Sequence, residues 1–248
     1  MANWNEPQPT RTGFGASPSL NGAVIGRQTA VDQGLRSYML SIYNYMTSGV
    51  LLSGIVALLF APVAERMMLS GSPLLWLIML APLAFVLFMS FGANRMSTTT
   101  LQAMFWGFCA AMGLSLSTIF AVYTGASIAA TFFATAGAFA GLSLVGYTTK
   151  KDLSGMGSFL IMGVVGLLIA SVLNIFLRSP GLTWAVSFLG VLIFAGLTAY
   201  DTQRLKNDYH RLRGTEFMGK AVVLGALSLY LDFINMFQFL LSFMGQRD

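Results

Sequence analysis

Asp232 constrains this chain more than any other residue, because it lies near the middle of the last apolar segment. Between Ala221 and Gln246 no other residue is charged. A charged carboxylate at the centre of a bilayer costs about 2.5–3.5 kcal/mol. A membrane helix therefore keeps such a residue only when it is protonated, paired with another polar group, or facing a wet cavity.

Other polar residues surround Asp232 at helical spacing. They recur at intervals of three and four residues, which places them on one face of a helix. This polar stripe consists of Ser228, Asp232, Asn235, Gln238 and Ser242. Because Leu, Phe and Met cover the remaining faces, we expect the helix to lie inside a bundle, where the stripe forms a polar path or seam.

The composition indicates an integral membrane protein. Hydrophobic residues make up 56% of the chain and charged residues 9%, whereas soluble domains carry about 25% charged residues. The single cysteine, Cys109, excludes a disulfide framework and a thiolate zinc site. We interpret the net charge of +5 as a topology signal, and we expect no nucleic-acid partner and no cofactor.

Charge-free windows predict an all-α protein with seven transmembrane helices, each of about 20 residues and so long enough for a ~30 Å hydrocarbon core. The charge-free windows are residues 37–64, 67–94, 96–149 (two helices, with a break at 123–125), 153–177 and 179–200; residues 219–245, which carry Asp232, give the last helix. Residues 1–35 are polar and predict a disordered tail, and residues 36–248 form the membrane domain. A small-xxx-small motif, Gly137 to Gly141, predicts a close helix approach.

The distribution of Lys and Arg predicts the orientation. With the N-terminus in the cytoplasm, eleven basic residues lie on the cytoplasmic side and three on the other, as the positive-inside rule requires. The outer three are Arg66, Arg178 and Arg247. We expect the cell (inner) membrane as the location. A re-entrant last segment, divided at Asp232, remains an alternative, because each half is too short to cross alone.

Two further charged residues lie next to apolar windows. Arg95 directly follows the window 67–94, and Asp201 directly follows the window 179–200 of the sixth helix. Both are placed at the cytoplasmic side, so an Arg95–Asp201 pair is geometrically sensible. The alternatives are that each is an interfacial residue satisfied by water, and that Asp232 is a neutral carboxyl hydrogen-bonded inside the bundle.

An Asp201–Asp232 dyad is the sharper hypothesis. Two carboxyls in a low dielectric cannot both ionise cheaply, so they share a proton and change charge near neutral pH. When both are charged they repel each other, and Arg95 can capture one of them. The dyad requires the sixth helix to continue past residue 203, or the seventh to begin late, so that the two depths match.

The same residues resemble the Bax inhibitor family, the transmembrane Bax-inhibitor-motif proteins. The resemblance covers residues 36–245 and is most specific in Tyr200-Asp201-Thr202-Gln203 and in the segment from Leu229 to Phe237, where Met236 replaces the usual Leu. It implies a bundle in which the last helix is central. It also implies a pH-sensitive calcium leak with Asp201 and Asp232 as the sensor and Arg95 as the latch.

Calcium is then the candidate permeant ion. Ca²⁺ takes 6–8 oxygen ligands, so Asp201, Asp232 and Asn235 with waters form at most a transient site. The expected partners are the lipid bilayer, calcium and protons.

Two other functional classes remain. An intramembrane aspartyl protease also uses two aspartates, but the bulky Leu229-Tyr230-Leu231 before Asp232 replaces the open Gly-x-Gly of that class, and we expect no enzyme. A contact regulator of a membrane protease or of a stress or cell-death partner, acting without significant ion conduction, is the alternative function. Its partner is another membrane protein.

Overall fold

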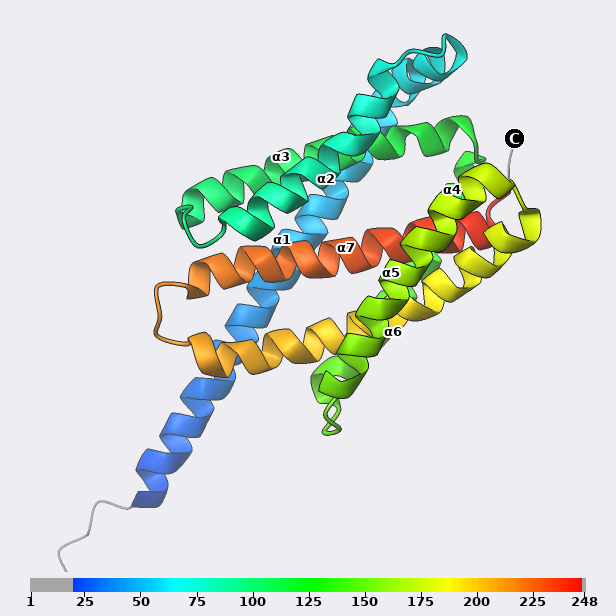
Figure 1. The fold of residues 1–248 in the computed structure, drawn as a ribbon. Coiled ribbons are helices and arrows are strands. Elements are labelled where there is room, and N and C mark those ends of the chain that lie inside the picture. Colours follow the sequence, from blue (N-terminus) through cyan, green and yellow to red (C-terminus); the bar gives the residue numbers. More distant parts are fainter. Residues whose placement is uncertain (1–19, 247–248) are drawn as a thin grey trace, which may run out of the picture. The chain divides into compact units, whose positions relative to one another are not determined.

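Seven α-helices account for nearly all of the chain in the computed structural model, which describes residues 20–246 and their side chains from residue 33 onward. The elements are α1 Leu20–Leu69, α2 Leu74–Gly92, α3 Thr98–Leu116, the 3-10 turn η1 Ser117–Ala121, α4 Gly125–Thr148, α5 Ser154–Leu177, α6 Pro180–Leu212 and α7 Met218–Met244 (Figure 1). Each α-helix contains an apolar stretch long enough to cross a membrane. The prediction of seven transmembrane helices is confirmed.

The chain divides into two units, Met1–Ser37 and Tyr38–Asp248. The predicted polar tail falls in the first unit, and its residues 1–19 lie outside the described residues. Helix α1 begins at Leu20. The second unit contains the rest of α1 and all other helices.

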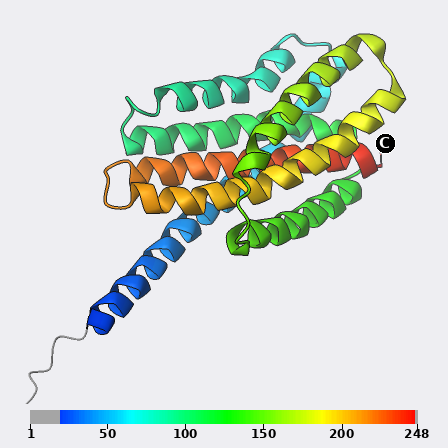
Figure 2. The same cartoon turned by 60° about the horizontal axis from the view of Figure 1, so that its bottom comes forward.

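Helix α7 is the most buried of the seven, whereas α2 and α5 are the least buried. It packs against α3, α4 and α6, and both ribbon views show α6 and α7 side by side (Figures 1 and 2). Its length of 27 residues is uninterrupted at Asp232, so the chain does not form a re-entrant hairpin there. The predicted central position of the last helix is confirmed.

A buried hydroxyl pair attaches α7 to α1 and α3. The Ser53 hydroxyl of α1 donates to the carbonyl of Cys109 on α3 at 2.7 Å, and Tyr230 of α7 lies 2.6 Å from the same hydroxyl. Because Ser53 uses its proton on a carbonyl, the Tyr230 hydroxyl is the donor to Ser53. The Tyr230 ring packs edge-on against Phe105 and Phe108 of α3.

The close approach of α4 to a neighbour occurs at Gly146 and not at the predicted motif. A Cβ built on Gly146 would collide with the carbonyl oxygen of Ala199 on α6, whereas one on Gly137 or Gly141 meets nothing within 4 Å. The prediction for Gly137 and Gly141 is therefore wrong. The motif lies on an exposed face of α4, because spacing alone does not determine how a helix is rotated about its axis.

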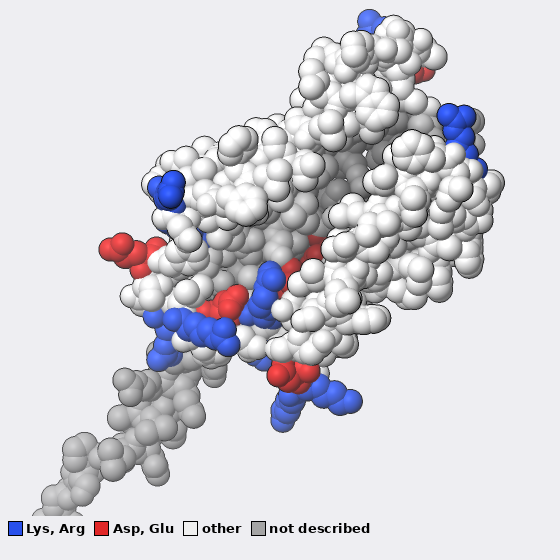
Figure 3. Space-filling model, in the orientation of Figure 1, with Lys and Arg blue, Asp and Glu red and all other residues white. Residues whose placement is uncertain are grey.

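The basic residues separate along the second unit as the positive-inside rule predicts. The α2–α3, α4–α5 and α6–α7 connections contain or adjoin Arg95, Lys150, Lys151, Arg211, Arg213 and Lys220. At the opposite end of the bundle, Arg66 lies in the last turn of α1 and Arg178 follows α5. The space-filling view shows most blue atoms at one end of this face (Figure 3). Which end faces the cytoplasm stays a prediction.

We expect Gly146→Ala to destabilise the protein by about 1–3 kcal/mol, the usual cost of overpacking. The added methyl collides with the backbone at Ala199, which cannot rotate away as a side chain can. Gly137→Ala on the same helix is the matched control and should be neutral or stabilising, because Ala favours the helix. Thermal unfolding of the purified variants in detergent measures the difference. Equal stability of the two variants would contradict the α4–α6 contact.

We expect the α6–α7 turn to face the cytoplasm. In a Cys109→Ala background, Asp208→Cys should resist an impermeant maleimide in intact cells and react after lysis. Ser70→Cys, in the α1–α2 turn at the opposite end, should react in intact cells. Labelling of position 208 from outside would reverse the orientation.

Candidate functional site at the α6–α7 interface

Asp201 lies at the centre of a polar network between α6 and α7. Its side chain is almost completely buried. One carboxylate oxygen, Oδ1, is 3.2 Å from Nη1 of Arg204, one turn further along α6. The other, Oδ2, accepts a short hydrogen bond from the Ser228 hydroxyl of α7.

Arg204 closes this network into a ring of three side chains. Its Nη2 donates to Ser228 Oγ at 3.0 Å, so the guanidinium contacts both members of the Asp201–Ser228 pair. Ser228 accepts this bond because its own proton goes to Asp201. The Arg204 side chain is 41% exposed, so the buried carboxylate of Asp201 connects through Arg204 to the surface.

Asp232 lies one helical turn beyond Ser228 on the same face of α7. Residues four apart on a helix have Cβ atoms about 5–6 Å apart, so Asp232 follows directly after the side chain that binds Asp201. It is buried, and its Oδ2 has no hydrogen-bond partner among the described residues. The charges of Asp201 and Arg204 are both near enough to act on it.

Helix α6 is long enough to place Asp201 at the depth in the bundle that an Asp201–Asp232 dyad requires. It continues without interruption to Leu212, past residue 203, which satisfies the condition set by the sequence. Asp201 contacts Ser228 across the α6–α7 interface, and Asp232 lies one turn after Ser228 on the same face of α7. Both carboxyls therefore lie at this interface. Within the described residues the direct hydrogen bond of Asp201 goes to Ser228 and not to Asp232, and a shared proton stays a prediction.

Arg95 lies away from this network. It follows the C-terminal end of α2 and is exposed. The ion pair that Asp201 makes within the described residues is with Arg204. A latch at Arg95 stays a prediction, which would require a second arrangement of the helices.

The polar stripe of α7 faces α6 at both ends. Ser228 contacts Asp201, and Ser242 accepts a hydrogen bond from Ser187 of α6 at 2.9 Å. Between them, Asn235 donates to the carbonyl of Leu231 in its own helix. Gln238 is exposed. The seam is therefore polar at its two ends and does not form a continuous hydrogen-bonded path.

The sequence model of the family described as "Inhibitor of apoptosis-promoting Bax1" matches residues 35–248. This range contains the whole polar network. The chain belongs to the Bax inhibitor family.

Relatives from several bacteria support this membership. The chain is 47% identical to the inner membrane protein YbhL of Escherichia coli over 218 residues, covering 86% of this chain and 93% of YbhL. It is 49% identical to an uncharacterized protein of Caulobacter vibrioides over 229 residues, covering 87% and 91%. It is 34% identical to the membrane protein SpyM3_0260 of Streptococcus pyogenes over 232 residues, covering 92% of this chain and all of that one.

The Bax inhibitor signature Tyr200 to Gln203 contacts four different parts of the bundle. The Tyr200 ring lies against Gly157 of α5, where no side chain would fit, and Thr202 lies 3.5 Å from the Tyr43 hydroxyl of α1. Gln203 donates to the Lys151 carbonyl and accepts from the Leu153 amide, each at 2.8 Å. It thereby attaches the α4–α5 connection to α6. Each residue of the signature thus has a separate partner, with Asp201 in the network.

Arg204 is the site residue that sequence reasoning missed. Because it follows the apolar window of α6, the sequence identifies it only as one of the eleven basic residues expected on the cytoplasmic side. Its position three residues after Asp201 is the signal that identifies it, since residues three apart are neighbours on a helix.

We expect Arg204→Gln to reduce stability by about 1–3 kcal/mol at neutral pH, between the values for exposed and for fully buried pairs. The ion pair contributes only while Asp201 is ionised, so the deficit should shrink as the pH falls and Asp201 becomes protonated. Arg211→Gln, an exposed arginine further along α6, is the control. Thermal unfolding at several pH values measures the effect, and a deficit that is constant with pH would contradict the ion pair.

Proposed function

We propose that this member of the Bax inhibitor family is a pH-sensitive calcium leak of the inner membrane, gated by protons on Asp201 and Asp232. One observation carries the proposal. Two buried carboxyls lie at the same helix interface. Within residues 20–246, Asp201 contacts a cation and a hydroxyl that hold its charge, whereas Asp232 Oδ2 has no hydrogen-bond partner. Such an arrangement responds to protons because the two groups have unequal environments.

The proposed resting state is the observed one. Ionised Asp201 is held by Arg204 and Ser228, which ties α6 to α7 through side chains at the basic end of the bundle. Protonation of Asp201 removes the charge that Arg204 binds, and the guanidinium, already partly exposed, is then free to turn to solvent. The α6–α7 contact loosens at this point.

Asp232 is proposed as the second proton site. When Asp201 is ionised, a second negative charge one turn away along α7 would be repelled, so the proton favours Asp232. When the proton moves to Asp201, Asp232 becomes an available oxygen ligand in the interface. Arg95 is proposed as an alternative partner of Asp201 in a rearranged bundle, as the resemblance implies.

Calcium would pass this interface and would not be stored in it. Among the described residues no group of three or more His, Cys, Asp and Glu side chains comes together. Asp201 and Asp232 with waters provide fewer oxygens than the 6–8 that Ca²⁺ prefers. A weak, transient site is what conduction needs, because an ion must also leave.

Calcium flux into liposomes that contain the purified protein, measured from about pH 6 to about pH 8, tests the proposal. Asp232→Asn should fold and resist heat about as well as the parent. Its flux should lose most of its pH dependence, because Asp201 no longer has a like charge nearby and stays paired with Arg204 over a wider range. Asp201→Asn should also flatten the profile, and its baseline leak should rise because Arg204 loses its partner.

Asp152→Asn is the matched control, because Asp152 is an exposed carboxylate in the α4–α5 connection and should leave the profile unchanged. If Asp201→Asn and Asp232→Asn both keep the parental pH profile in well-folded protein, the proton gate is wrong. A contact regulator of another membrane protein then becomes the better proposal.

A further inference from the structure

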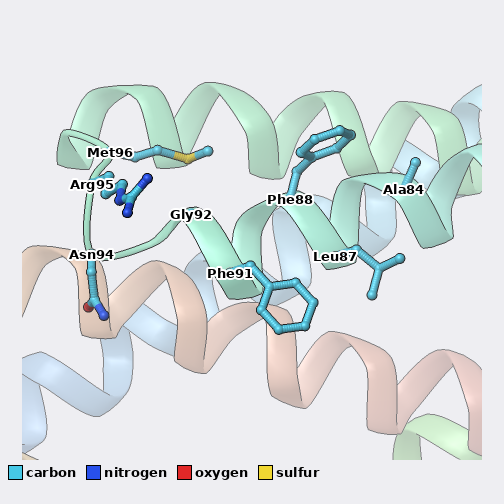
Figure 4. A pocket seen from close by; sticks show the side chains of 8 residues that line it. All are labelled: Ala84, Leu87, Phe88, Phe91, Gly92, Asn94, Arg95 and Met96. Atoms are coloured by element: carbon cyan, nitrogen blue, oxygen red, sulfur yellow. The ribbon is translucent and has the colours of Figure 1, made fainter.

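A groove lies on the outside of α2 and in the connection that follows it. It has a volume of about 780 Å³, within the range of about 300–1,000 Å³ that is usual for ligand sites. Its main lining residues are Leu87, Phe88, Phe91, Asn94, Arg95 and Met96 (Figure 4). We refer to it as the α2 groove.

The long side of the α2 groove is apolar and exposed. Phe91 is 84% exposed and Phe88 is 65% exposed, on a helix that is apolar enough to cross a membrane. No described helix packs over these rings, so lipid chains are their solvent in a bilayer. The surface between them is hollowed, which gives a chain more contact area than a flat helix face would.

One end of the α2 groove is cationic. Arg95 is exposed, and its side chain forms no hydrogen bond or ion pair with the part of the chain that the structure describes. Asn94, also exposed, lies beside it and offers an amide donor. Figure 4 shows both side chains in the connection that follows α2, beyond Phe91 (Figure 4).

Lys220 explains why Arg95 is free. A cation near the end of a helix normally binds the last carbonyls. Here Lys220 of α7 donates to the carbonyls of Ala93 and Asn94, at 3.1 and 3.4 Å. The end of α2 is therefore already neutralised, and the guanidinium of Arg95 is available to another anion.

We propose that the α2 groove binds an anionic phospholipid. One acyl chain lies along Leu87, Phe88 and Phe91, and the lipid phosphate binds Arg95 and Asn94. Guanidinium groups bind phosphate oxygens with two parallel hydrogen bonds, and basic pockets at helix ends are typical headgroup sites. The site shares Arg95 with the proposed latch, but lipid binding there does not require the calcium leak.

The apolar side of the groove selects a lipid over a free phosphate ion. A single exposed arginine provides one charge-assisted contact, which is weak in water. In a bilayer or a micelle the acyl chain is already out of water, so it gains van der Waals packing against the rings of the groove, a contact that a free phosphate ion cannot make. A lipid phosphate bound to Arg95 would also compete with Asp201 for that guanidinium.

Native mass spectrometry of the purified full chain in detergent tests the site. Phosphatidylglycerol and phosphatidylcholine with identical acyl chains are titrated against the parent and Arg95→Gln. The parent should retain phosphatidylglycerol in preference to phosphatidylcholine. Arg95→Gln should lower the ratio of bound phosphatidylglycerol to bound phosphatidylcholine by about tenfold, which corresponds to the free energy of one charge-assisted hydrogen bond. Arg95→Lys should keep part of it, since it retains the charge without the bidentate geometry.

Arg213→Gln is the matched control, because Arg213 is an exposed arginine in the α6–α7 turn, away from the groove residues. It should leave the preference unchanged. Phe91→Ala should weaken retention of both lipids and keep their ratio, because it changes the chain contact alone.

Three outcomes would overturn the proposal. The first is that Arg95→Gln matches the parent, the second is that Arg213→Gln loses as much preference as Arg95→Gln, and the third is that inorganic phosphate displaces the lipid. The first would place the lipid elsewhere, the second would reduce the effect to general charge, and the third would make the site an anion site. Correct folding is checked by size-exclusion chromatography, and the calcium flux assay is not involved.

Discussion

The buried carboxylate of Asp201 needs a counter-charge, and much of the architecture around it depends on how that charge is supplied. Taking an ion out of water costs several kcal/mol unless a partner compensates. Arg204 is that partner, and it reaches Asp201 only if α6 stays helical for at least one more turn. The length of α6, from Pro180 to Leu212, is therefore a condition for the site and not simply a consequence of membrane thickness.

The extension of α6 past Asp201 also determines which residues surround the polar network. With α6 extended, Gln203 reaches the α4–α5 connection and Thr202 approaches α1. Ser228 on α7 then completes the shell of Asp201. Helix α7 is held separately by Tyr230, whose hydroxyl bonds Ser53 between α1 and α3. The central helix is thus fixed on one side by an apolar aromatic cluster and on the other by charge.

The sequence predicted what depends on a single helix. Apolar length gave the seven helices, and the spacing around Asp232 placed α7 inside the bundle. Asp201 and Asp232 were identified because charge is rare in apolar segments. The sequence did not predict features that depend on how two helices are rotated against each other. These are the close approach at Gly146 instead of Gly137 and the exposed position of Gln238. Arg204 escapes prediction for another reason, since a basic residue just after an apolar window predicts only the orientation of the helix and not a partner for Asp201.

Asp232 is the residue that packing alone does not explain. Its Oδ2 is buried without a partner among the described residues, and an unsatisfied buried polar atom costs about 1–3 kcal/mol. A leucine would fill the site without that cost. Natural sequences break such local rules mainly where function requires it. Among the described residues, the charged groups of Asp201 and Arg204 lie near enough to act on Asp232. The unpartnered oxygen of Asp232 and the paired carboxylate of Asp201 therefore lie close together along the α6–α7 contact, because Asp232 follows the Ser228 that binds Asp201 by one helical turn. At such a short separation in a buried site, a negative charge on one carboxyl opposes a charge on the other.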